Sequence, residues 1–577
     1  MVVLGVIMVI TIVALAYISR SDGELQYGQN MLLRTKADFL AESALEHARG
    51  LILNPQEVSG EYWTGATSQQ IDSGDFYYDV SVEPNAAYSG PTRWCNYDIS
   101  CQAYRLSGGE RTAQSNFEVL LRLNPCIAYY SGTTLDSQIG SNTLIFGDVY
   151  CAGNLTALSF ISGDVFCNNY SGTLPEGQHM QPEELSLEWP RIEANDFTSN
   201  YTVETISSSL ISSQVLEPYN PVRVYHRAGD LEIAGDVEIN GMLIVEGDLQ
   251  ISGVGNLIRA GKALPALLVT GNLRIQKDAG LDIEGLAVVD GKVSINVGSM
   301  FLNVTGGVFA ANGIFETTED CSGNGSDGVI YGQPIWRTAG GHSSGSGAAE
   351  LDGLDDNIVE PNGGAYLNGL SAATVTCWVK SHVTNQDRGI FYTKIPTGVD
   401  EALGLRYDKT GSAAVQCITA SLQTNLGQTQ IQSSSNRQDL NWQHLALVWS
   451  SGNGLKLYIN GVEDTLSYPG DALGGTITGV EKFMLGCGAT GQYWDGLMDD
   501  VRIYSRALDA NDIVAVMGGA ESIVGRKTHW KLDESPMCFV TIAAAPAKTA
   551  VWCWSDSGQR RKWAQASGSF YKVIRRN

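Results

Sequence analysis

The chain has 577 residues, of which 65 are glycine and only 17 % are charged, and its formal net charge is −25. This length exceeds what one hydrophobic core holds, so we expect three or four domains, mainly of β structure because glycine is abundant and exposed-helix charges are scarce. The acidic balance argues against nucleic acid as a partner, since phosphate binding needs a basic face.

The first element in chain order is a long helix. Residues 1–18, MVVLGVIMVITIVALAYI, carry no charge, and at about 1.5 Å per residue they cover most of a bilayer core roughly 30 Å thick. Helical spacing of apolar residues continues to residue 53, where Asn54-Pro55 disfavours helix. We therefore predict one helix over residues 1–54, apolar in its first half and amphipathic in its second. A cleaved signal peptide fits less well because no A-x-A site follows the apolar run.

This helix resembles a known family. The apolar run, the exit Ser19-Arg20 and the stretch KADFLAESALEHA at 36–48 are similar to the N-terminal helix of PilX-type minor pilins and general-secretion pseudopilins, although Gly5 stands where that family often has Glu. The resemblance implies docking in the inner membrane or among the helices of a pilus or pseudopilus, and an ordinary single-span anchor is the alternative. The residues expected on this membrane and assembly helix are Val9, Ile12, Leu15, Leu33 and Leu40.

A small β head is predicted over residues 55–138. Alternating runs at 76–82, 104–106 and 117–123 are separated by Gly, Pro and Asn turns, which is typical of an antiparallel sheet. A pilin head has this order of elements.

Eleven cysteines make an odd number, so a complete set of disulfides is excluded. Cys95 with Cys101, and Cys538 with Cys553, are close enough in sequence to close small loops in an oxidising periplasm or exterior. None of the cysteines has CxxC spacing, which argues against zinc and thioredoxin-like chemistry.

An internal repeat is the clearest pattern. Residues 229–252 read GDLEIA, GDVEIN, GMLIVE and GDLQIS, four hexads in register. The third and fifth places are apolar and point inward, because side chains alternate across a strand, and each glycine allows a bend between strands. Three hexads would form one triangular coil, and stacked coils form a β-solenoid. Related phrases begin at 147, 163, 271 and 291, so we predict a solenoid over 139–315 with an insertion at 172–227 that crosses a face or an end.

Two further features bear on the solenoid. Cys151 and Cys167 hold equivalent inward places, which predicts buried core thiols, with a bridge between rungs as the alternative. No hexad carries the His that hexad acyltransferases need. By its Gly-Asp-apolar-x-apolar phrase the run resembles the solenoids of bactofilin-like, polymer-forming proteins, which implies a structural role.

Two signature matches after residue 316 are rejected. A G-x-G-x-x-G at Gly323, Gly325 and Gly328 is followed by a strand-like segment instead of a helix. A G-x-S-x-G at 341–345 lies in a Gly/Ser run with no strand before it and no helix after it.

Residues 316–520 resemble a LamG-like jelly roll, a concanavalin-type β-sandwich. The phrases that carry the resemblance are AELDGLDDNIV (349–359), TVTCWVK (374–380), NWQHLALVW (441–449), LKLYINGV (455–462) and DGLMDDVRIYSRAL (495–508). Asn460-Gly461 predicts a hairpin turn of the primed type, and residues 509–517 predict a short closing helix that begins at an Asp.

The LamG resemblance implies a glycan or protein ligand and one structural Ca²⁺. Its ligands would be Asp352 and Asp355 or Asp356 in the first loop, with Asp499 or Asp500 in the last. The alternative is that these carboxylates cap turns and pair with Arg502. Tyr493 and Trp494 would stack on a sugar, or the aromatic would pack beneath the strand instead.

The tail at 521–577 holds two apolar runs, 539–542 and 551–554, and a basic end. HWKLDE at 529–534 resembles the opening strand of a LamG domain displaced to the end of the chain. The tail either completes the sandwich or returns to the head.

These observations predict a multidomain, mainly β protein with a long N-terminal α-helix, a small α+β pilin-like head, a β-solenoid and a LamG-like β-sandwich. We expect a non-enzymatic, single-pass or pilus-incorporated surface protein with a periplasmic or extracellular body that displays an adhesion domain. The alternatives are a scaffold that polymerises through the solenoid, and a glycan-processing enzyme, which would need two carboxylates roughly 5 to 9 Å apart in a groove.

Overall fold

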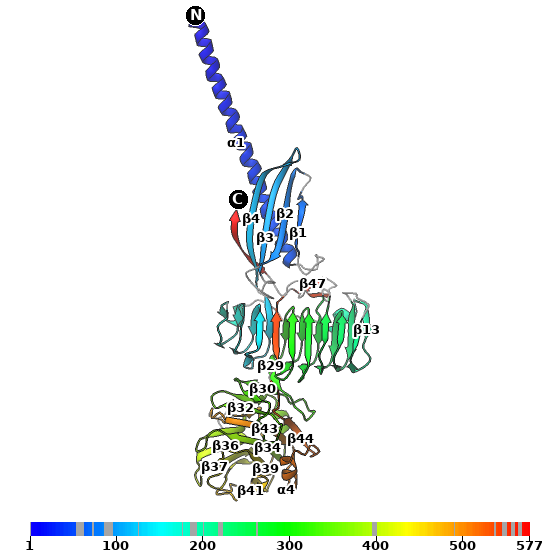
Figure 1. Ribbon diagram of the computed structural model, residues 1–577, viewed down its shortest axis with the longest axis vertical. Helices are drawn as coiled ribbons and strands as arrows, with labels where there is room; N and C mark the ends of the chain where they lie inside the picture. Colours follow the sequence, from blue (N-terminus) through cyan, green and yellow to red (C-terminus); the bar gives the residue numbers. More distant parts are fainter. Residues whose placement is uncertain are drawn as a thin grey trace.

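The protein is an elongated chain of four parts in a computed structural model (Figure 1). A long helix projects from one end, a small sheet packs on its second half, a β-solenoid follows, and a β-sandwich forms the other end. The predicted fold class is confirmed as a mainly β protein with a long N-terminal helix, a β-solenoid and a C-terminal β-sandwich. The described residues are 2–53, 63–71, 74–85, 96–124, 126–175, 177–184, 193–199, 201–216, 223–260, 264–394, 401–489, 491–535, 538–544, 551–554, 560–563 and 568–576.

Helix α1 (Val2–Leu53) is a single helix of 52 residues, as predicted. Its apolar first half is exposed, whereas one side of its second half is buried against the head sheet. Several of the buried residues are small, which lets the helix backbone approach the strands closely. The buried residues of the helix are Ala37, Leu40, Ala41, Ala44, Leu45, Ala48 and Ile52, and the small ones are the four alanines.

The head sheet has five antiparallel strands in the order β1-β2-β3-β4-β48. The alternating runs predicted as strands lie in β2, β3 and β4. The last strand comes from the C-terminal end of the chain, so part of the tail returns to the head (Figure 1). The strands are β1 (Gly65–Gln69), β2 (Phe76–Pro84), β3 (Asn96–Ser107), β4 (Glu110–Asn124) and β48 (Gly568–Arg576).

The solenoid is built from short strands that pair in parallel along three faces. In chain order they are β5 (Ile127–Ser131), β6 (Ser137–Ile139), β7 (Thr143–Phe146), β8 (Asp148–Cys151), β9 (Leu155–Ala157), β10 (Val165–Phe166), β11 (Tyr170–Gly172), β12 (His179–Met180), β13 (Val203–Thr205), β14 (Leu210–Ile211), β15 (Gln214–Leu216), β16 (Val224–Ala228), β17 (Leu231–Ile233), β18 (Val237–Asn240), β19 (Met242–Glu246), β20 (Leu249–Ile251), β21 (Asn256–Arg259), β22 (Leu267–Val269), β23 (Leu273–Ile275), β24 (Gly280–Glu284), β25 (Ala287–Val289), β26 (Val293–Asn296), β27 (Phe301–Thr305), β28 (Val308–Ala310), β29 (Ile314–Thr318) and β45 (Phe539–Ala543).

The chain enters the solenoid in the middle of its first face, whose order is β12-β10-β8-β5-β28-β25-β22-β19-β16-β13. From β5 it coils outward to β12, crosses to β13 at the other end, and coils back until β28 pairs with β5. The crossing segment includes η3 (Pro182–Glu184) and α2 (Ala194–Thr198). Phe197 of α2 belongs to a buried apolar cluster on the outer side of the first face, which also includes Val288 and Phe309.

The insertion predicted at 172–227 is shorter in the structure. Strands β13, β14 and β15 lie within that span, and each pairs with a following solenoid strand, so residues 203–216 form an end rung. Strand β5 lies within the predicted head, 55–138, yet belongs to the solenoid. Both differences arise because these segments lack the Gly-Asp phrase from which the rungs were predicted.

Stacking between rungs explains that phrase. A Cβ on Gly271 would lie 2.6 Å from the carbonyl carbon of Gly247 in the neighbouring rung, so no larger residue fits there. The next residue continues the stack: Asp230 Oδ1 accepts from the Asp248 amide at 2.8 Å, and Asp248 Oδ1 accepts from the Asn272 amide at 2.8 Å. The glycines therefore permit close stacking of rungs, and the acidic side chains satisfy amides of the next turn.

The sandwich is inserted into the last rung of the solenoid. The chain leaves β29, forms the sandwich, and returns as β45, which pairs with β27 and β7 on the second face. One sandwich sheet extends the third solenoid face in the order β29-β30-β33-β42-β35-β36-β37-β38. Its strands are β30 (Gly328–Tyr331), β33 (Asn357–Glu360), β35 (Arg388–Lys394), β36 (Glu401–Thr410), β37 (Val415–Thr424), β38 (Gly427–Gln432) and β42 (Lys482–Leu485).

The second sandwich sheet has the order β31-β32-β43-β34-β39-β40-β41, and β44 also pairs with β43. Asn460 and Gly461 both have positive φ, 51° and 80°, as the predicted turn requires. The predicted closing helix is α4. Asp509 caps its N-terminus, because the Asp509 carboxylate accepts a hydrogen bond from the Asp512 amide. The elements are β31 (Ile335–Arg337), β32 (Ala348–Asp352), α3 (Gly364–Leu367), β34 (Ala372–Ser381), β39 (Gln443–Ser450), β40 (Gly454–Ile459), β41 (Val462–Glu463), β43 (Asp495–Tyr504), α4 (Ala510–Met517) and β44 (Arg526–Trp530).

The tail therefore does both things that the sequence left open. Residues 526–530 complete the sandwich through β44, and β48 completes the head. The second apolar run forms β46 (Val551–Trp554), which pairs with β47 (Arg560–Trp563).

The cysteines of the solenoid core are as predicted. Cys151 and Cys167 are fully buried free thiols on the inward side, and burial raises the pKa of the Cys167 thiol to about 12. They therefore act as small core residues, and no bridge joins these two rungs.

The two small disulfide loops expected at Cys95–Cys101 and Cys538–Cys553 are wrong. Cys101 is a buried free thiol, and so is Cys538, which contacts Ser299 Oγ at 2.9 Å. Cys126 at the entry to the solenoid is disulfide-bonded. Closeness in sequence was a poor guide because both free thiols point into cores, where apolar neighbours surround them.

Candidate functional site

An acidic loop joins β32 to β33 in the sandwich. Carboxylate oxygens of Asp352, Asp355 and Asp356 lie within 4.8 Å of one another. Asp352 and Asp355 are exposed, whereas Asp356 is buried. The structure thus brings together Asp352 with both Asp355 and Asp356, which the sequence had offered as alternatives.

Backbone amides hold this loop in shape. Asp356 accepts from the amides of Gln333 at 2.5 Å and Asp352 at 3.0 Å, and Asp352 Oδ1 accepts from the Leu354 amide at 2.8 Å. Burial, together with the nearby charges of Asp352 and Asp355, raises the pKa of Asp356 to about 6 in spite of these hydrogen bonds. A bound cation would relieve that unfavourable charge, so the donor set fits a hard cation at Asp352 Oδ2 and the Asp355 carboxylate.

The last-loop carboxylates do not join this group. Asp352 pairs across the sheet with Asp495, so Asp499 lies four residues farther along β43. There its Oδ2 is 2.6 Å from His342 Nδ1 and accepts from the His342 amide at 2.9 Å. Asp499 is therefore not a ligand of the acidic loop, and the expected three-residue set is corrected.

Asp500 takes part in a buried ion pair instead. Its carboxylate accepts from Arg502 Nε at 2.7 Å and lies 2.8 Å from His529 Nε2. Burial raises the pKa of Asp500, but the hydrogen bond with His529 and the pair with Arg502 more than offset this and lower it to about 2. This is the pairing with Arg502 that the sequence left as the alternative.

The two aromatic residues of the neighbouring loop have different environments. Trp494 is fully buried and packs edge-on against Tyr407, with ring centroids 5.0 Å apart. It cannot stack on a ligand, so this expectation is corrected in favour of packing beneath the strand. Tyr493 is half-buried. Burial raises the pKa of its hydroxyl, and the nearby charges of Cys487 and Asp355 raise it as well. Of the pair, only Tyr493 borders the acidic loop.

The rejected G-x-S-x-G run contains a histidine that sequence reasoning missed. His342 pairs with Asp499 and stacks on Trp378, with ring centroids 4.5 Å apart. The loop serine Ser346 hydrogen-bonds to Asp499 at 3.4 Å and to the Ser343 carbonyl, and not to the histidine. The group is therefore arranged to hold the loop, because its serine does not face the base.

The five residues assigned to the membrane and assembly helix fall into two groups. Val9, Ile12 and Leu15 are exposed by 56 to 61 %, on the exposed first half of α1. Leu33 is half-buried, and Leu40 packs in the head core. By length and composition α1 can cross a membrane: its most apolar window has a mean hydropathy of 2.7, and none of that window is buried inside the protein.

Comparison with known proteins places the sandwich. Residues 352–514 match the family model Laminin_G_3, described as the concanavalin A-like lectin/glucanases superfamily. The match begins at the acidic loop and ends within α4. A search of curated proteins gave no match.

Several solved structures are similar to this part of the chain. Domain 4 of AbnA, a GH43 extracellular arabinanase from Geobacillus stearothermophilus, in complex with arabinotriose, shares 20 % identity over 34 % of this chain and 91 % of that one, with a TM-score of 0.26. The binding domain of Paraclostridial Mosquitocidal Protein 1 shares 13 % identity over 36 % of this chain and 51 % of that one, with a TM-score of 0.28. The receptor binding domain of botulinum neurotoxin mosaic serotype C/D shares 18 % identity over 34 % of this chain and 47 % of that one, with a TM-score of 0.28.

This chain spans about half the length of those last two structures. The family match and the two packed sheets agree on the architecture of the sandwich. The outer domain is therefore a concanavalin A-like β-sandwich, carried on a β-solenoid behind a long N-terminal helix.

Proposed function

We propose that this protein is a membrane-tethered surface protein that holds a concanavalin A-like binding domain away from the membrane. The observation that carries the proposal is the placement of the two ends. The apolar half of α1 is wholly exposed at one end, the sandwich lies at the other, and the solenoid separates them (Figure 1). An exposed apolar helix of this length is costly in water and stable in a bilayer.

The finer proposal is a PilX-type, pilin-like role. The helix would dock in the inner membrane or among other pilin or pseudopilin helices, with the body in the periplasm or outside the cell. The five-stranded sheet packed on the second half of α1 supports it. The sandwich would bind a glycan or a surface protein without catalysis. The family description covers lectins as well as glucanases, and beside the His342–Asp499 pair the Ser346 hydroxyl bonds to Asp499 and not to the histidine.

A bridging experiment tests the tether and the sandwich together. Full-length protein is reconstituted into liposomes and mixed with beads that carry a glycan panel. We expect beads and liposomes to sediment together on at least one glycan. Val9→Asp should abolish bridging, because a carboxylate at the middle of the apolar run costs about 3 kcal/mol in a bilayer.

The matched control is Leu25→Asp, at a side chain that is 59 % exposed outside the uncharged run. It should leave bridging intact. Unchanged bridging by Val9→Asp, or a wild-type chain that floats free of liposomes, would overturn the tether. Liposome capture without bead capture on any glycan would overturn the glycan ligand alone.

We also propose that the acidic loop holds one structural Ca²⁺. Exposed oxygens of Asp352 and Asp355 would be its ligands, with backbone carbonyls completing the shell. Calcium should raise the unfolding temperature of the protein over that measured in chelator, and Asp355→Asn should reduce the increase. Asp471→Asn, at an exposed acidic residue elsewhere in the sandwich, is the control. Equal melting with calcium and with chelator would rule the ion out.

A polymerising scaffold is the second candidate. Among the strands that the structure describes, β12 and β13 at the ends of the first face each pair with a neighbour on one side only, and such an edge could pair with another copy. In that case the purified full-length chain would form filaments visible by electron microscopy, whereas a simple stalk would remain single.

A further inference from the structure

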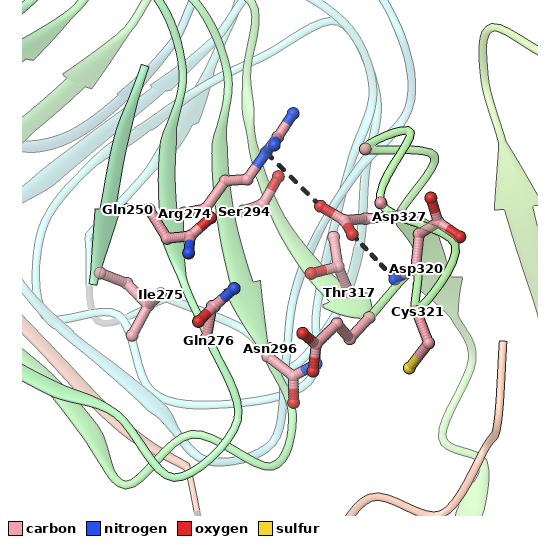
Figure 2. Close-up of a pocket in the computed structure, with 13 residues that line it drawn as sticks. Gln250, Arg274, Ile275, Gln276, Ser294, Asn296, Thr317, Asp320, Cys321 and Asp327 are labelled. Carbon is pink, nitrogen blue, oxygen red and sulfur yellow. Dashed lines mark hydrogen bonds and ion pairs between the residues drawn. The ribbon is translucent and has the colours of Figure 1, made fainter. Parts of the chain in front are cut away.

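A polar pocket lies where the solenoid meets the sandwich, away from the acidic loop. It has a volume of about 300 Å³ and lies between the third solenoid face and the first sandwich loop, residues 319–327 (Figure 2). That volume is at the lower end of ligand pockets, which span roughly 300 to 1,000 Å³. The solenoid wall consists of Gln250, Arg274, Ile275, Gln276, Ser294, Asn296 and Thr317.

Rung stacking places these side chains in two columns. Gln250, Arg274 and Ser294 are direct neighbours across β20, β23 and β26, and Asn296 faces Thr317 across β26 and β29. The wall is therefore a regular array of amides, hydroxyls and one guanidinium. Loops alone would not hold polar groups in such fixed positions, because the strands set the spacing between rungs.

Three buried side-chain atoms in this wall have no hydrogen-bond partner in the described part of the chain: Arg274 Nε, which lies 3.7 Å from the Asp327 carboxylate, Ser294 Oγ and Asn296 Nδ2. Ser294 and Asn296 are each only 2 % exposed. The amide orientation of Asn296 is set by its other atom, because Oδ1 accepts from the Gly298 amide at 2.7 Å. A buried donor without a partner costs about 1 to 3 kcal/mol, so these groups point to a ligand that supplies oxygen atoms.

The opposite wall is held by its own contacts. Asp320 accepts from the amides of Ser322, Ser326 and His529, so its carboxylate shapes the loop and is not free for a ligand. Asp327 forms an ion pair with Arg274 at 3.7 Å, which joins the two walls (Figure 2).

Gly325 explains how the loop comes so close. A Cβ at this position would lie 2.8 Å from a guanidinium nitrogen of Arg274. Gly323, with φ of +82°, is exposed at the rim. The glycines that mimicked a dinucleotide signature thus let the loop lie against the solenoid wall.

The lining chemistry selects the class of ligand. One guanidinium stands against the carboxylates of Glu319, Asp320 and Asp327, which disfavours an anion. None of the lining residues is aromatic, which disfavours a stacked base. The unsatisfied Asn296 Nδ2 is a donor only and the Arg274 guanidinium is positively charged, which disfavours a metal cation at these atoms. Hydroxyl and ring oxygens accept from such donors, while the Glu319 carboxylate accepts from a ligand hydroxyl.

We propose that this junction pocket binds one neutral sugar unit, held by Ser294, Asn296 and the neighbouring amides of the solenoid wall. The site is independent of the acidic loop, so the two can fail separately. Bound sugar would contact the solenoid and the sandwich at once and would thereby stabilise their junction.

Cys321 supplies a reporter inside the pocket. Cys321 is half-buried and lines the pocket. Other free thiols in the described part of the chain are buried, namely Cys101, Cys151, Cys167, Cys377, Cys417 and Cys538. Full-length protein in detergent is alkylated at pH 9 with glucose, galactose, mannose or N-acetylglucosamine, each free and as its methyl β-glycoside. Peptide mass spectrometry follows modification of Cys321. We expect at least one sugar to slow it threefold or more. Protection by the free sugars alone means a free-sugar site, and protection by the glycosides means a glycan terminus.

Ser294→Ala and Asn296→Asp test the assignment. Each removes one unsatisfied donor, and Asn296→Asp keeps the acceptor for Gly298, so half-protecting sugar concentrations should rise about tenfold. Ser294→Ala should not lower the unfolding temperature, because its hydroxyl has no partner to lose.

Ser171→Ala, at an exposed serine elsewhere on the solenoid, and Asp355→Asn in the acidic loop should keep wild-type protection. Protection by no sugar, or equal protection in Ser294→Ala and wild type, would overturn the sugar site and leave the proposed function of the sandwich untouched.

Discussion

Two glutamates of the sandwich are buried without full pairing. Glu360 Oε1 accepts from the Asn362 amide at 2.8 Å, and Glu534 Oε1 accepts from the Glu319 amide at 3.1 Å and from the hydroxyl of Thr318. The second carboxyl oxygen of each has no partner among the described residues. Burial raises the pKa of Glu360 to about 7 and that of Glu534 to about 7.

These shifts predict how stability depends on pH. Each carboxyl keeps its proton in the folded protein where the unfolded chain, with an ordinary pKa of 4.5, has lost it. The stabilisation is therefore complete below pH 4.5 and is lost as pH rises to 7. We expect the unfolding free energy of the sandwich to fall by on the order of 2 to 3 kcal/mol per group over this range. Calorimetry from pH 4.5 to 8 measures the slope.

Glu360→Gln should flatten the slope, because the amide has no charge to bury. Exposed Glu463→Gln is the matched control and should leave it unchanged. A wild-type unfolding temperature that rises between pH 5 and 7 would contradict the assignment.

At this scale the sequence predicted residue types better than partners. The carboxylates of the first loop gather because they are neighbours in the chain. Asp499 does not join them, because cross-strand pairing puts Asp495 beside Asp352. Trp494 next to Tyr493 shows the same limit: successive side chains of an extended segment point to opposite sides, and only the packed sheets decide which side is the core.

Among the elements, the solenoid rungs depend most on single positions. A Cβ at Gly271 would lie 2.4 Å from Asp248 Oδ1 and 2.6 Å from the Gly247 carbonyl carbon. Gly271→Ala should therefore separate two rungs and destabilise the protein by about 1 to 3 kcal/mol. Chemical denaturation measures the loss.

Gly28→Ala is the matched control, because nothing lies within 4 Å of the added Cβ on the exposed part of α1. It should stabilise the helix slightly, as alanine is the better helix former. Equal effects of the two substitutions would contradict close stacking at the Gly-Asp phrase.

The repeat made the solenoid predictable because each hexad carries its own inward pair and its own glycine. Segments without the phrase were missed, since β5 and the end rung at 203–216 owe their place to pairing with neighbours. The junction pocket was missed for the same reason. Ser294 and Asn296 are ordinary outward residues in the sequence, and the sequence does not show that the loop at 319–327 lies opposite them.

For the whole molecule, the sequence predicted which domains are present and their order. It left open whether the tail returns to the head, and it did not predict that residues 539–543 return to the solenoid. A run as short as 539–542 alternates well enough for any sheet, so its place between β27 and β7 depends on the gap that the last rung leaves there. The strand that closes the head is set in the same way by the open edge of β4.

This return path matters when the molecule is under tension. A load applied to the sandwich while α1 is anchored reaches the solenoid through two covalent routes, one entering β29 and the other entering β45. Strand β45 is flanked by partners on both sides, so pulling it out breaks two ladders of hydrogen bonds at once. The load is divided again in the head, because the N-terminal helix α1 and the C-terminal strand β48 both belong to it. Rupture therefore requires several ladders of hydrogen bonds to shear together.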